Sequence, residues 1–261
     1  MTQAPTEHLE TTRADGVLTV TFRRPEAFNA LSDEMAAGFV AALTDARSDP
    51  EVRAVLVTGS GAAFSAGADL EGDDPVRKFG DHTMLGANAI SRCVVDLDKP
   101  VVAAVNGIAA GIGASICFAA DLAVTTESAA FLLAFSQVGL MPDGGSSLTV
   151  AASAGRAKAM RMALLAEPLS AREAFDAGLV SHVVADDEFE TTVDKIVRRL
   201  ARGPSVAFAS TKRAINAATL GGLEDALERE RTGQVALFGT EDAAEGMRAF
   251  VQKRRPEFTG R

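Results

Sequence analysis

The sequence predicts a mixed α/β fold in which a β-sheet core is followed by a helical C-terminal part. Leu18, Val20 and Phe22 alternate with threonines, which is the pattern of a half-buried strand. The uninterrupted apolar run 101–105 has strand length and suits a central strand that is covered on both faces. From Asp187 onward almost the whole chain has helical periodicity. Strand patterns therefore concentrate early in the chain and helical patterns late.

The first strand pattern is followed by a helix with clear start and stop signals. Ser32 can act as the N-cap, because its hydroxyl can accept a hydrogen bond from a first-turn amide. Apolar residues then recur at helical spacing, at Met35, Phe39, Val40 and Leu43. The helix is expected to end before Asp49 and Pro50, since proline disfavours a helical residue in front of it. Residues 52–58 predict the next strand.

The middle of the chain alternates short strand and helix patterns. Residues 71–81 are charged and are expected to be mobile, as a candidate lid or pocket wall, and a helix is predicted from there to Asp96. Further helices are predicted at 111–120 and at 144–166, the second broken near Gly155, and short strands at 122–125 and 130–133.

A capping box marks the next helix. Ser170 can bond the amide of Glu173 while the Glu173 side chain reaches back to the N-cap amide, and Gly178 suits the left-handed residue after the helix end. A strand is predicted at 179–184, and Pro204 stands at a favourable first-turn position of a later helix.

Composition narrows the function classes. The 261 residues carry 26 Lys and Arg against 35 Asp and Glu, a net charge of −9, which argues against nucleic acid or an anionic membrane as a partner. The apolar stretches are too short for a membrane span, and the N-terminal residues lack the features of a signal peptide. We therefore expect a cytoplasmic protein.

Cysteine and histidine usage argues against a metal site. Cys93 and Cys117 form no CxxC pair and are expected to be buried small apolar residues. The three histidines, His8, His82 and His182, are far apart in the sequence, so no metal is predicted.

Two loops rich in glycine and alanine each follow an apolar strand pattern, at 59–69 and 106–113. Small residues let backbone N–H groups approach a ligand closely, and two such donors on one oxygen can hold an oxyanion. Each loop is also compatible with an ordinary tight turn between strand and helix.

Other glycine motifs fit poorly. A dinucleotide fingerprint starting at Gly59 fails because Phe64 takes the place of the third glycine. A nucleophile elbow around Ser65 lacks its leading glycine, which is Ala63, so Ser65 is interpreted as a packing residue. No Walker A sequence is present.

Four segments together carry a family resemblance, at 24–31, 64–70, 99–107 and 250–258. With their spacing and the helical tail, they resemble the enoyl-CoA hydratase/isomerase (crotonase) superfamily over nearly the whole chain. The resemblance implies a spiral of ββα units at 1–200 with the acyl-CoA site, and an all-helical trimerisation region at 201–261. It also implies an acyl-CoA thioester substrate, no cofactor besides the CoA of that substrate, and a homotrimer or a dimer of trimers.

The resemblance assigns the oxyanion hole to the backbone N–H groups of Ala68 and Ile112. Removing or adding a proton next to a thioester creates an enolate-like oxygen that such amides stabilise. Ile112 departs from the glycine usual at this position, and its side chain is expected to narrow the pocket.

The resemblance also places the CoA moiety near two segments and the C-terminal helix. The residues concerned are Ala27, Phe28, Ala66, Gly67, Ala68, Asp69, Leu70, Phe250 and Lys253. Cations near CoA phosphates make electrostatic sense in an acidic protein. Two alternatives stay open: residues 253–255 as a solvated helix end, and Asp69 as the cap of a following helix.

Hydratases of this family use two glutamates, and Ser115 and Phe135 occupy the matching positions here. Neither side chain is a general acid or base near neutral pH, so two-glutamate hydration is not predicted. Asp143, in the segment 138–147, matches the single carboxylate of some isomerases of the superfamily.

One carboxylate suffices for double-bond isomerisation, because it removes a proton from one carbon and returns it to another. Apolar surroundings would raise the pKa of Asp143 and favour proton transfer at neutral pH. The alternatives are that Asp143 caps the helix after it, that the protein hydrates a 2-enoyl-CoA with a different acid and base, or that it binds acyl-CoA without catalysis. His82 lies in the candidate lid, and His182 is interpreted as structural.

Overall fold

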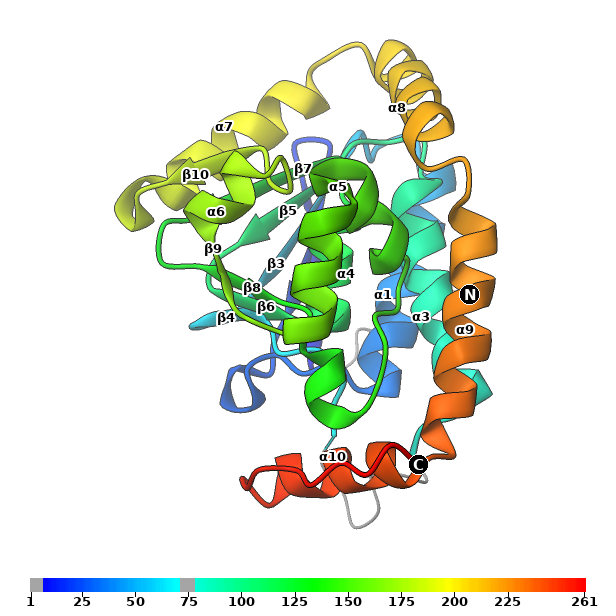
Figure 1. The fold of residues 1–261 in the computed structure, drawn as a ribbon. Helices are drawn as coiled ribbons and strands as arrows, with labels where there is room; N and C mark the ends of the chain where they lie inside the picture. Colours follow the sequence, from blue (N-terminus) through cyan, green and yellow to red (C-terminus); the bar gives the residue numbers. More distant parts are fainter. Residues whose placement is uncertain (1–6, 71–77) are drawn as a thin grey trace.

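The computed structural model describes residues 7–70 and 78–261, and a six-stranded sheet forms its centre (Figure 1). The strand order is β1 (Leu9–Ala14), β2 (Val17–Phe22), β3 (Ala54–Gly59), β5 (Val101–Val105), β7 (Leu122–Thr126) and β10 (His182–Val184). All neighbours are parallel except the β1–β2 hairpin. All five residues of β5 are buried, as the apolar run predicts for a central strand.

A smaller sheet of four short strands lies beside it. Its order is β4 (Ala63–Ser65), β6 (Ile108–Ala110), β8 (Ala130–Leu132) and β9 (Leu169–Ser170). The chain repeatedly adds one strand to each sheet and then a helix: β3 and β4 precede α3 (Asp81–Val95), and β5 and β6 precede α4 (Ile112–Ala119). This is a spiral of ββα units, the fold class that the sequence predicts.

Strand extents differ from the sequence prediction in two ways. The strand predicted at 179–184 begins only at His182, because the amides of Gly178 and Leu179 bond back to Phe175 and Ala174 at the end of α6 (Ala171–Asp176). The short strands β4, β6 and β9 and the edge strand β1 were not predicted. Two or three residues give no readable alternation, so only sheet pairing defines these short strands.

The predicted capping and chain-breaking signals are confirmed in three helices. Ser32 Oγ accepts from Met35 N at 3.2 Å at the start of α1 (Asp33–Ser48). Gly155, at φ 78°, interrupts α5 (Ser146–Leu165). Ser170 and Glu173 form the capping box of α6, and Gly178 has a φ of 77°.

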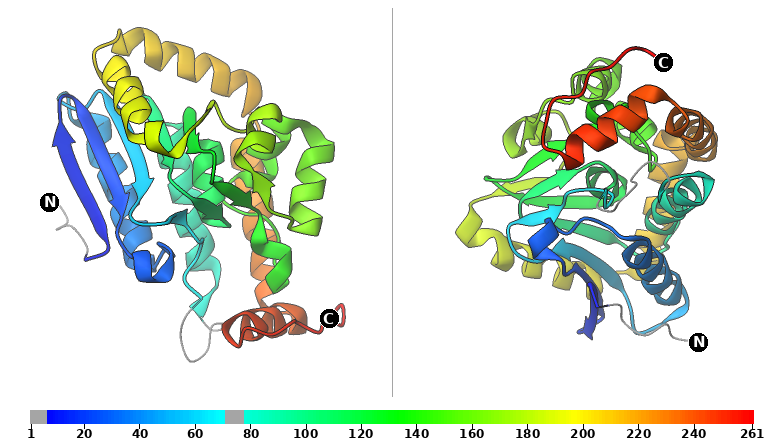
Figure 2. Two further views of the ribbon diagram at one scale, coloured as in Figure 1. Left: turned by 90° about the vertical axis from the view of Figure 1, so that its left-hand side faces the viewer. Right: turned by 90° about the horizontal axis from the view of Figure 1, so that it is seen from below.

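Two layers of apolar side chains hold the sheets. The main core lies between the sheets and the helices α1, α3, α4 and α5, around fully buried rings such as Phe22, Phe64 and Phe131. The opposite face of the large sheet is covered by α7 (Phe189–Ala201), whose Phe189, Val193 and Val197 pack on β-strand residues (Figure 2). Short 3-10 helices lie at Pro25–Ala27, Ala134–Val138 and Asp186–Glu188.

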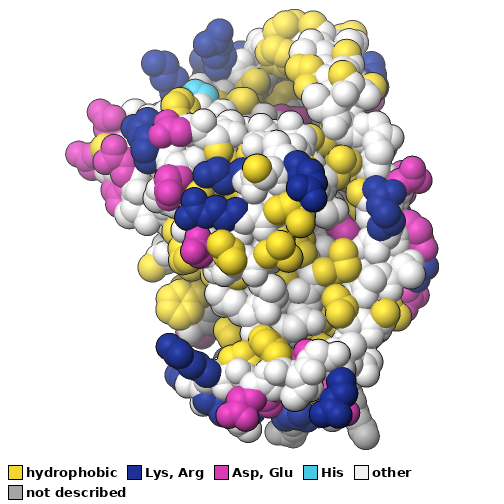
Figure 3. Space-filling model, viewed as in Figure 1, with side chains coloured by type: hydrophobic (Ala, Val, Ile, Leu, Met, Phe, Trp, Pro, Cys, Tyr) yellow, Lys and Arg dark blue, Asp and Glu magenta, His cyan; other side chains and the backbone are white. Residues whose placement is uncertain are grey.

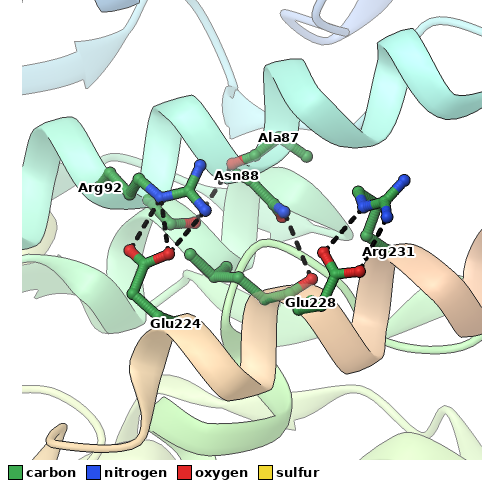
Figure 4. Close-up of polar contacts among 8 residues, drawn as sticks. Ala87, Asn88, Arg92, Glu224, Glu228 and Arg231 are labelled. Atoms are coloured by element: carbon green, nitrogen blue, oxygen red, sulfur yellow. Dashed lines mark hydrogen bonds and ion pairs between the residues drawn. The ribbon is translucent and has the colours of Figure 1, made fainter.

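The C-terminal part consists of α8 (Ser205–Thr219), α9 (Leu223–Phe238) and α10 (Glu241–Val251). Pro204 is the N-cap of α8, one position before the predicted first turn. α9 runs along α3, and Arg92 on α3 holds the Glu224 carboxylate with two nitrogens, at 2.8 and 2.7 Å (Figure 4).

Nowhere in residues 7–70 and 78–261 is a helix long and apolar enough to cross a membrane.

An ion pair between the buried Lys212 and the partly exposed Asp121 connects α8 to the sheet. Lys212 Nζ lies 2.8 Å from Asp121 Oδ2 and donates to the carbonyl of Val94 at 2.8 Å. The same Asp121 oxygen accepts from Val101 N at 2.7 Å. The next residue, Arg213, makes an exposed pair with Asp98 instead.

We expect Lys212→Met to lower the free energy of unfolding by roughly 2–3 kcal/mol, because it leaves the partly exposed Asp121 charge without its partner. Arg213→Met is the matched control, with an expected loss of about 1 kcal/mol or less for an exposed pair. Urea unfolding of the two variants gives both values. Equal losses would show that the Lys212–Asp121 pair is no more important than the surface one.

Candidate active site

One buried side chain organises the first of the two small-residue loops. Asn29 Nδ2 donates to the carbonyls of Ser60 and Ala63, both at 2.8 Å, and Asn29 Oδ1 accepts from Arg24 N. The chain around Asn29 then pairs with the loop after β4: Ala66 N donates to Phe28 O, and Leu31 N donates to Gly67 O at 2.7 Å. The predicted CoA-binding segments 27–28 and 66–70 therefore lie side by side.

The two small-residue loops meet backbone to backbone at Gly67 and Gly111. A Cβ atom on Gly67 would lie 3.0 Å from Ala110 O and 3.5 Å from the Cα of Gly111. Both glycines have positive φ, 99° and 51°, a conformation that side chains disfavour. Glycine at these two positions allows the loops to touch.

This contact brings two available backbone donors together. Gly67 O accepts a hydrogen bond from Leu31 N, and Asp69 N donates one to Leu31 O. The N–H of Ala68 belongs to the same peptide group as Gly67 O and points in the opposite direction. It therefore faces away from Leu31. Ile112 is the first residue of α4, so its N–H has no partner within the helix and lies at the positive end of the helix dipole.

Ala68, Ile112 and Asp143 line a single cavity of about 590 Å³. Asp69 lines it too, whereas Ala27, Phe28, Ala66, Gly67 and Leu70 do not. The rest of the wall is a groove between α1 and α3, lined mainly by small apolar side chains, among them Ala36, Ala37, Val40, Ala41, Gly86 and Ala87. The cavity therefore has a polar end at the two amides and an apolar end between two helices.

The carboxyl of Asp143 has an unusual environment. Its Oδ2 accepts from Gln234 Nε2 at 3.0 Å, while its Oδ1 is buried and has no hydrogen-bond partner within the described part of the chain. Burial raises the pKa of Asp143 to about 7, and the nearby Glu230 carboxylate also raises it, while the bond from Gln234 lowers it. Asp143 thus changes protonation near neutral pH.

Asp143 does not cap the helix after it. The N-cap of α5 is Gly145, and it is the backbone carbonyl of Asp143 that accepts from Ser146. The Asp143 carbonyl also accepts from Ser115 Oγ at 2.9 Å, so Ser115 supports this turn as a hydrogen-bond donor. Phe135 is buried, and its ring lies 3.9 Å from the position of a Cβ on Gly111. Neither residue brings a carboxylate to the site.

The remaining predicted site residues lie apart from the cavity or at its edge. Asp69 accepts from Arg24 Nη1 at 2.7 Å and lies 3.5 Å from Lys78 Nζ. Phe250 and Lys253 are exposed at the end of α10 and do not line the cavity, so their part in CoA binding stays a prediction. Most of the candidate lid, 71–77, lies outside the described residues.

Of the histidines and cysteines discussed above, His82 lies at the cavity and the others lie away from it. His82 lines the open side of the cavity from α3, whereas His182 on β10 contacts Ser181 Oγ away from it. Cys93 and Cys117 are buried as predicted, and burial raises the pKa of the Cys93 thiol to about 12. Within residues 7–70 and 78–261, no group of three His, Cys, Asp or Glu side chains is placed to hold a metal ion.

Two residues near Asp143 were missed in the sequence. Glu230 and Gln234 on α9 are both fully buried and contact residues 141–147, the turn that carries Asp143 and is called the Asp143 turn below. They continue the buried stripe that Leu223 and Leu227 begin, with the intervals of three and four residues that are typical of one helix face. Polar residues at core positions of a predicted helix are a signal that could have singled them out.

Comparisons with known proteins find one family over nearly the whole chain. The family model of enoyl-CoA hydratase/isomerase matches residues 12–261. The 1,2-epoxyphenylacetyl-CoA isomerase of Escherichia coli (strain K12) is 39% identical over 94% of this chain and 96% of its own, and 4-chlorobenzoyl coenzyme A dehalogenase-1 of Arthrobacter sp is 34% identical over 94% and 91%.

A solved structure is similar throughout. The crystal structure of an enoyl-CoA hydratase from Mycobacterium avium subsp. paratuberculosis K-10 has a TM-score of 0.92 and 47% identity, covering 98% of this chain and 100% of that one. The chain therefore belongs to the enoyl-CoA hydratase/isomerase family, as an acyl-CoA enzyme.

The buried Asp143 carboxyl predicts a pH-dependent stability. An exposed aspartate loses its proton near pH 4, but folded Asp143 keeps it to about pH 7, so folding becomes less favourable as pH rises between these values. We expect Asp143→Asn to stabilise the protein relative to wild type by roughly 2.6 kcal/mol more at pH 8 than at pH 5.

Urea unfolding at the two pH values measures this difference, and Asp187→Asn, at an exposed position, is the control. A stability difference between Asp143→Asn and wild type that does not change with pH would contradict the raised pKa.

Proposed function

We propose that this enzyme moves the double bond of an enoyl-CoA thioester, with Asp143 as the single acid and base. The observation that carries the proposal is the buried Asp143 carboxyl, which lines the same cavity as Ala68 and Ile112. Its Oδ1 has no hydrogen-bond partner among residues 7–70 and 78–261. A pKa of about 7 lets this carboxyl both take up and release a proton under neutral conditions.

In the proposed reaction the thioester carbonyl accepts hydrogen bonds from the N–H groups of Ala68 and Ile112. The Asp143 carboxylate removes a proton from the α-carbon of a 3-enoyl thioester, and the electron pair is delocalised over the double bond and the thioester oxygen. The Asp143 carboxylic acid then returns that proton to the γ-carbon, and the double bond moves to the 2-position. The amides stabilise the oxyanion between the two steps.

The same geometry suggests where the substrate lies. The acyl group enters the groove between α1 and α3, because most of the small apolar side chains that line the cavity lie there. The CoA moiety lies along the paired segments 27–28 and 66–70, where Phe28 is 57% exposed. The Escherichia coli relative is named an isomerase of a CoA thioester, which supports isomerisation as the reaction class.

A second candidate is hydration of a 2-enoyl-CoA, which the name of the solved mycobacterial relative favours. Hydration needs a group to position water besides the proton donor. Ser115 and Phe135 provide no second carboxylate, which is why isomerisation is preferred.

Exposed apolar side chains support assembly of several copies of the chain, the trimer that the family resemblance implies. They include Leu164 and Leu165 on α5, at 65% and 60% exposure, and Val206 on α8, at 82%. Figure 3 shows apolar side chains exposed over α5 and α8 on one face of the molecule. Contact with a second copy would bury this surface.

The wild-type protein should convert a 3-enoyl-CoA to the 2-enoyl-CoA, with kcat/KM rising through about pH 7 because the ionised Asp143 is the active form. Asp143→Asn should lower kcat by roughly 10²- to 10⁴-fold while the affinity for the thioester stays within a few fold. Chromatographic product analysis and calorimetric binding check these outcomes.

Each result separates the candidates. Turnover of a 2-enoyl-CoA to the hydroxyacyl product, without conversion of the 3-enoyl-CoA, would replace isomerisation by hydration. Full activity in Asp143→Asn would remove Asp143 from either mechanism.

The groove predicts a length-dependent effect at Gly86. A Cβ on Gly86 would meet no heavy atom within 4 Å, so Gly86→Ala should fold well and keep kcat/KM within about twofold. Gly86→Phe should fill the groove and lower kcat/KM at least about tenfold for a long acyl chain, with a small effect on a four-carbon substrate. Equal losses for both substrates would place the acyl group elsewhere.

A further inference from the structure

The Asp143 turn rests on one face of α9. Gln234 makes three hydrogen bonds there: its Oε1 accepts from Met141 N at 3.0 Å, and its Nε2 donates to Met141 O at 2.9 Å and to Asp143 Oδ2 at 3.0 Å. A Cβ on Gly233 would lie 2.5 Å from Met141 Sδ, so the turn lies directly against the helix. Gln234 is completely buried.

One helical turn earlier, Glu230 fixes the other end of the same turn. Its Oε2 accepts from Gly145 N at 2.7 Å and its Oε1 from Ser147 N at 3.0 Å, at the N-terminus of α5. A carboxylate is well placed there, because it meets unpaired amides and the positive end of the helix dipole. Glu230 and Gln234 thus hold the backbone on both sides of Asp143.

The two carboxyl oxygens of Asp143 differ in their hydrogen bonding. Oδ2 is held by Gln234, and Oδ1 has no partner in the described part of the chain. Gln234 itself does not line the cavity, so it does not reach a substrate in this arrangement.

We propose that Gln234 is the positioning residue of the reaction: it fixes Oδ2 of Asp143 and leaves Oδ1 as the oxygen that takes up and returns the substrate proton. This inference rests on the proposed role of Asp143 as acid and base. An anchored carboxyl keeps one oxygen in a constant direction through both proton transfers, which a freely rotating carboxyl does not.

The electrostatic effect of Gln234 has a definite direction. Its N–H favours ionised Asp143 and lowers the pKa of that carboxyl, whereas the Glu230 carboxylate raises it. The other ionisable side chains that line the cavity are Asp33 and Asp45 on α1, His82 on α3, Lys78, and Asp69 of the first loop. Changes at Gln234 and at Glu230 should therefore move the pH dependence of catalysis in opposite directions.

The test compares Gln234→Met and Gln234→Glu with wild type in full pH profiles of kcat/KM on a 3-enoyl-CoA. Loss of the bond in Gln234→Met should raise the kinetic pKa by about one unit and lower kcat about tenfold, with KM within about twofold. Gln234→Glu should raise it further, since a second carboxyl then faces Asp143. Glu230→Gln removes a negative charge and should lower it.

Gln137→Met is the matched control. Gln137 donates to the carbonyl of Ala166 and does not line the cavity, so the same replacement there should change neither the profile nor kcat. Gln234→Glu keeps the shape of the side chain and the acceptor for Met141 N, and it serves if Gln234→Met does not fold.

The outcomes are distinct. A kinetic pKa that stays at the wild-type value in the folded Gln234 variants, or a tenfold rise in KM at unchanged kcat, would overturn the positioning role. If Asp143→Asn abolishes turnover while the Gln234 variants keep the wild-type profile, the proposed function stands and this inference fails. If Asp143→Asn stays active, the proposed function itself fails.

Discussion

The contact between Gly67 and Gly111 is the constraint on which the site depends. It joins a loop after β4 to the start of α4, and a side chain on Gly67 would meet the Ala110 carbonyl at 3.0 Å. Because the two backbones touch, the amides of Ala68 and Ile112 border one cavity although 44 positions separate them in the sequence. Both strands that lead into these loops are held by sheet pairing, β4 with β6, so the contact is built on rigid elements.

A second constraint comes from the C-terminal helices. α9 lies along α3 through Arg92 and Glu224, which Figure 4 shows, and through the hydrogen bond from Asn88 to the carbonyl of Leu227. That placement carries buried polar residues of α9 to the Asp143 turn. Helices that look like a separate appendage in the sequence therefore support the carboxyl that lines the cavity together with Ala68 and Ile112.

Burial explains why an ordinary aspartate gains a proton-transfer role here. Removing Asp143 from water disfavours its charged form, and Glu230 adds to this effect, while the hydrogen bond from Gln234 favours the charged form. The balance is a pKa of about 7 rather than the usual value near 4. Stability is given up at this position at neutral pH, as is common where a protein needs a reactive group.

The sequence by itself determined the order of the main elements and the helix signals at Ser32, Gly155 and Ser170, because capping, chain breaking and periodicity are local. It also singled out Ala68, Ile112 and Asp143 through family resemblance. Only the tertiary structure decided that these three share a cavity, and that Glu230 and Gln234 hold the Asp143 turn. Three short strands of the second sheet, β4, β6 and β9, and the pKa of Asp143 arise from contacts between distant segments, so no local pattern encodes them.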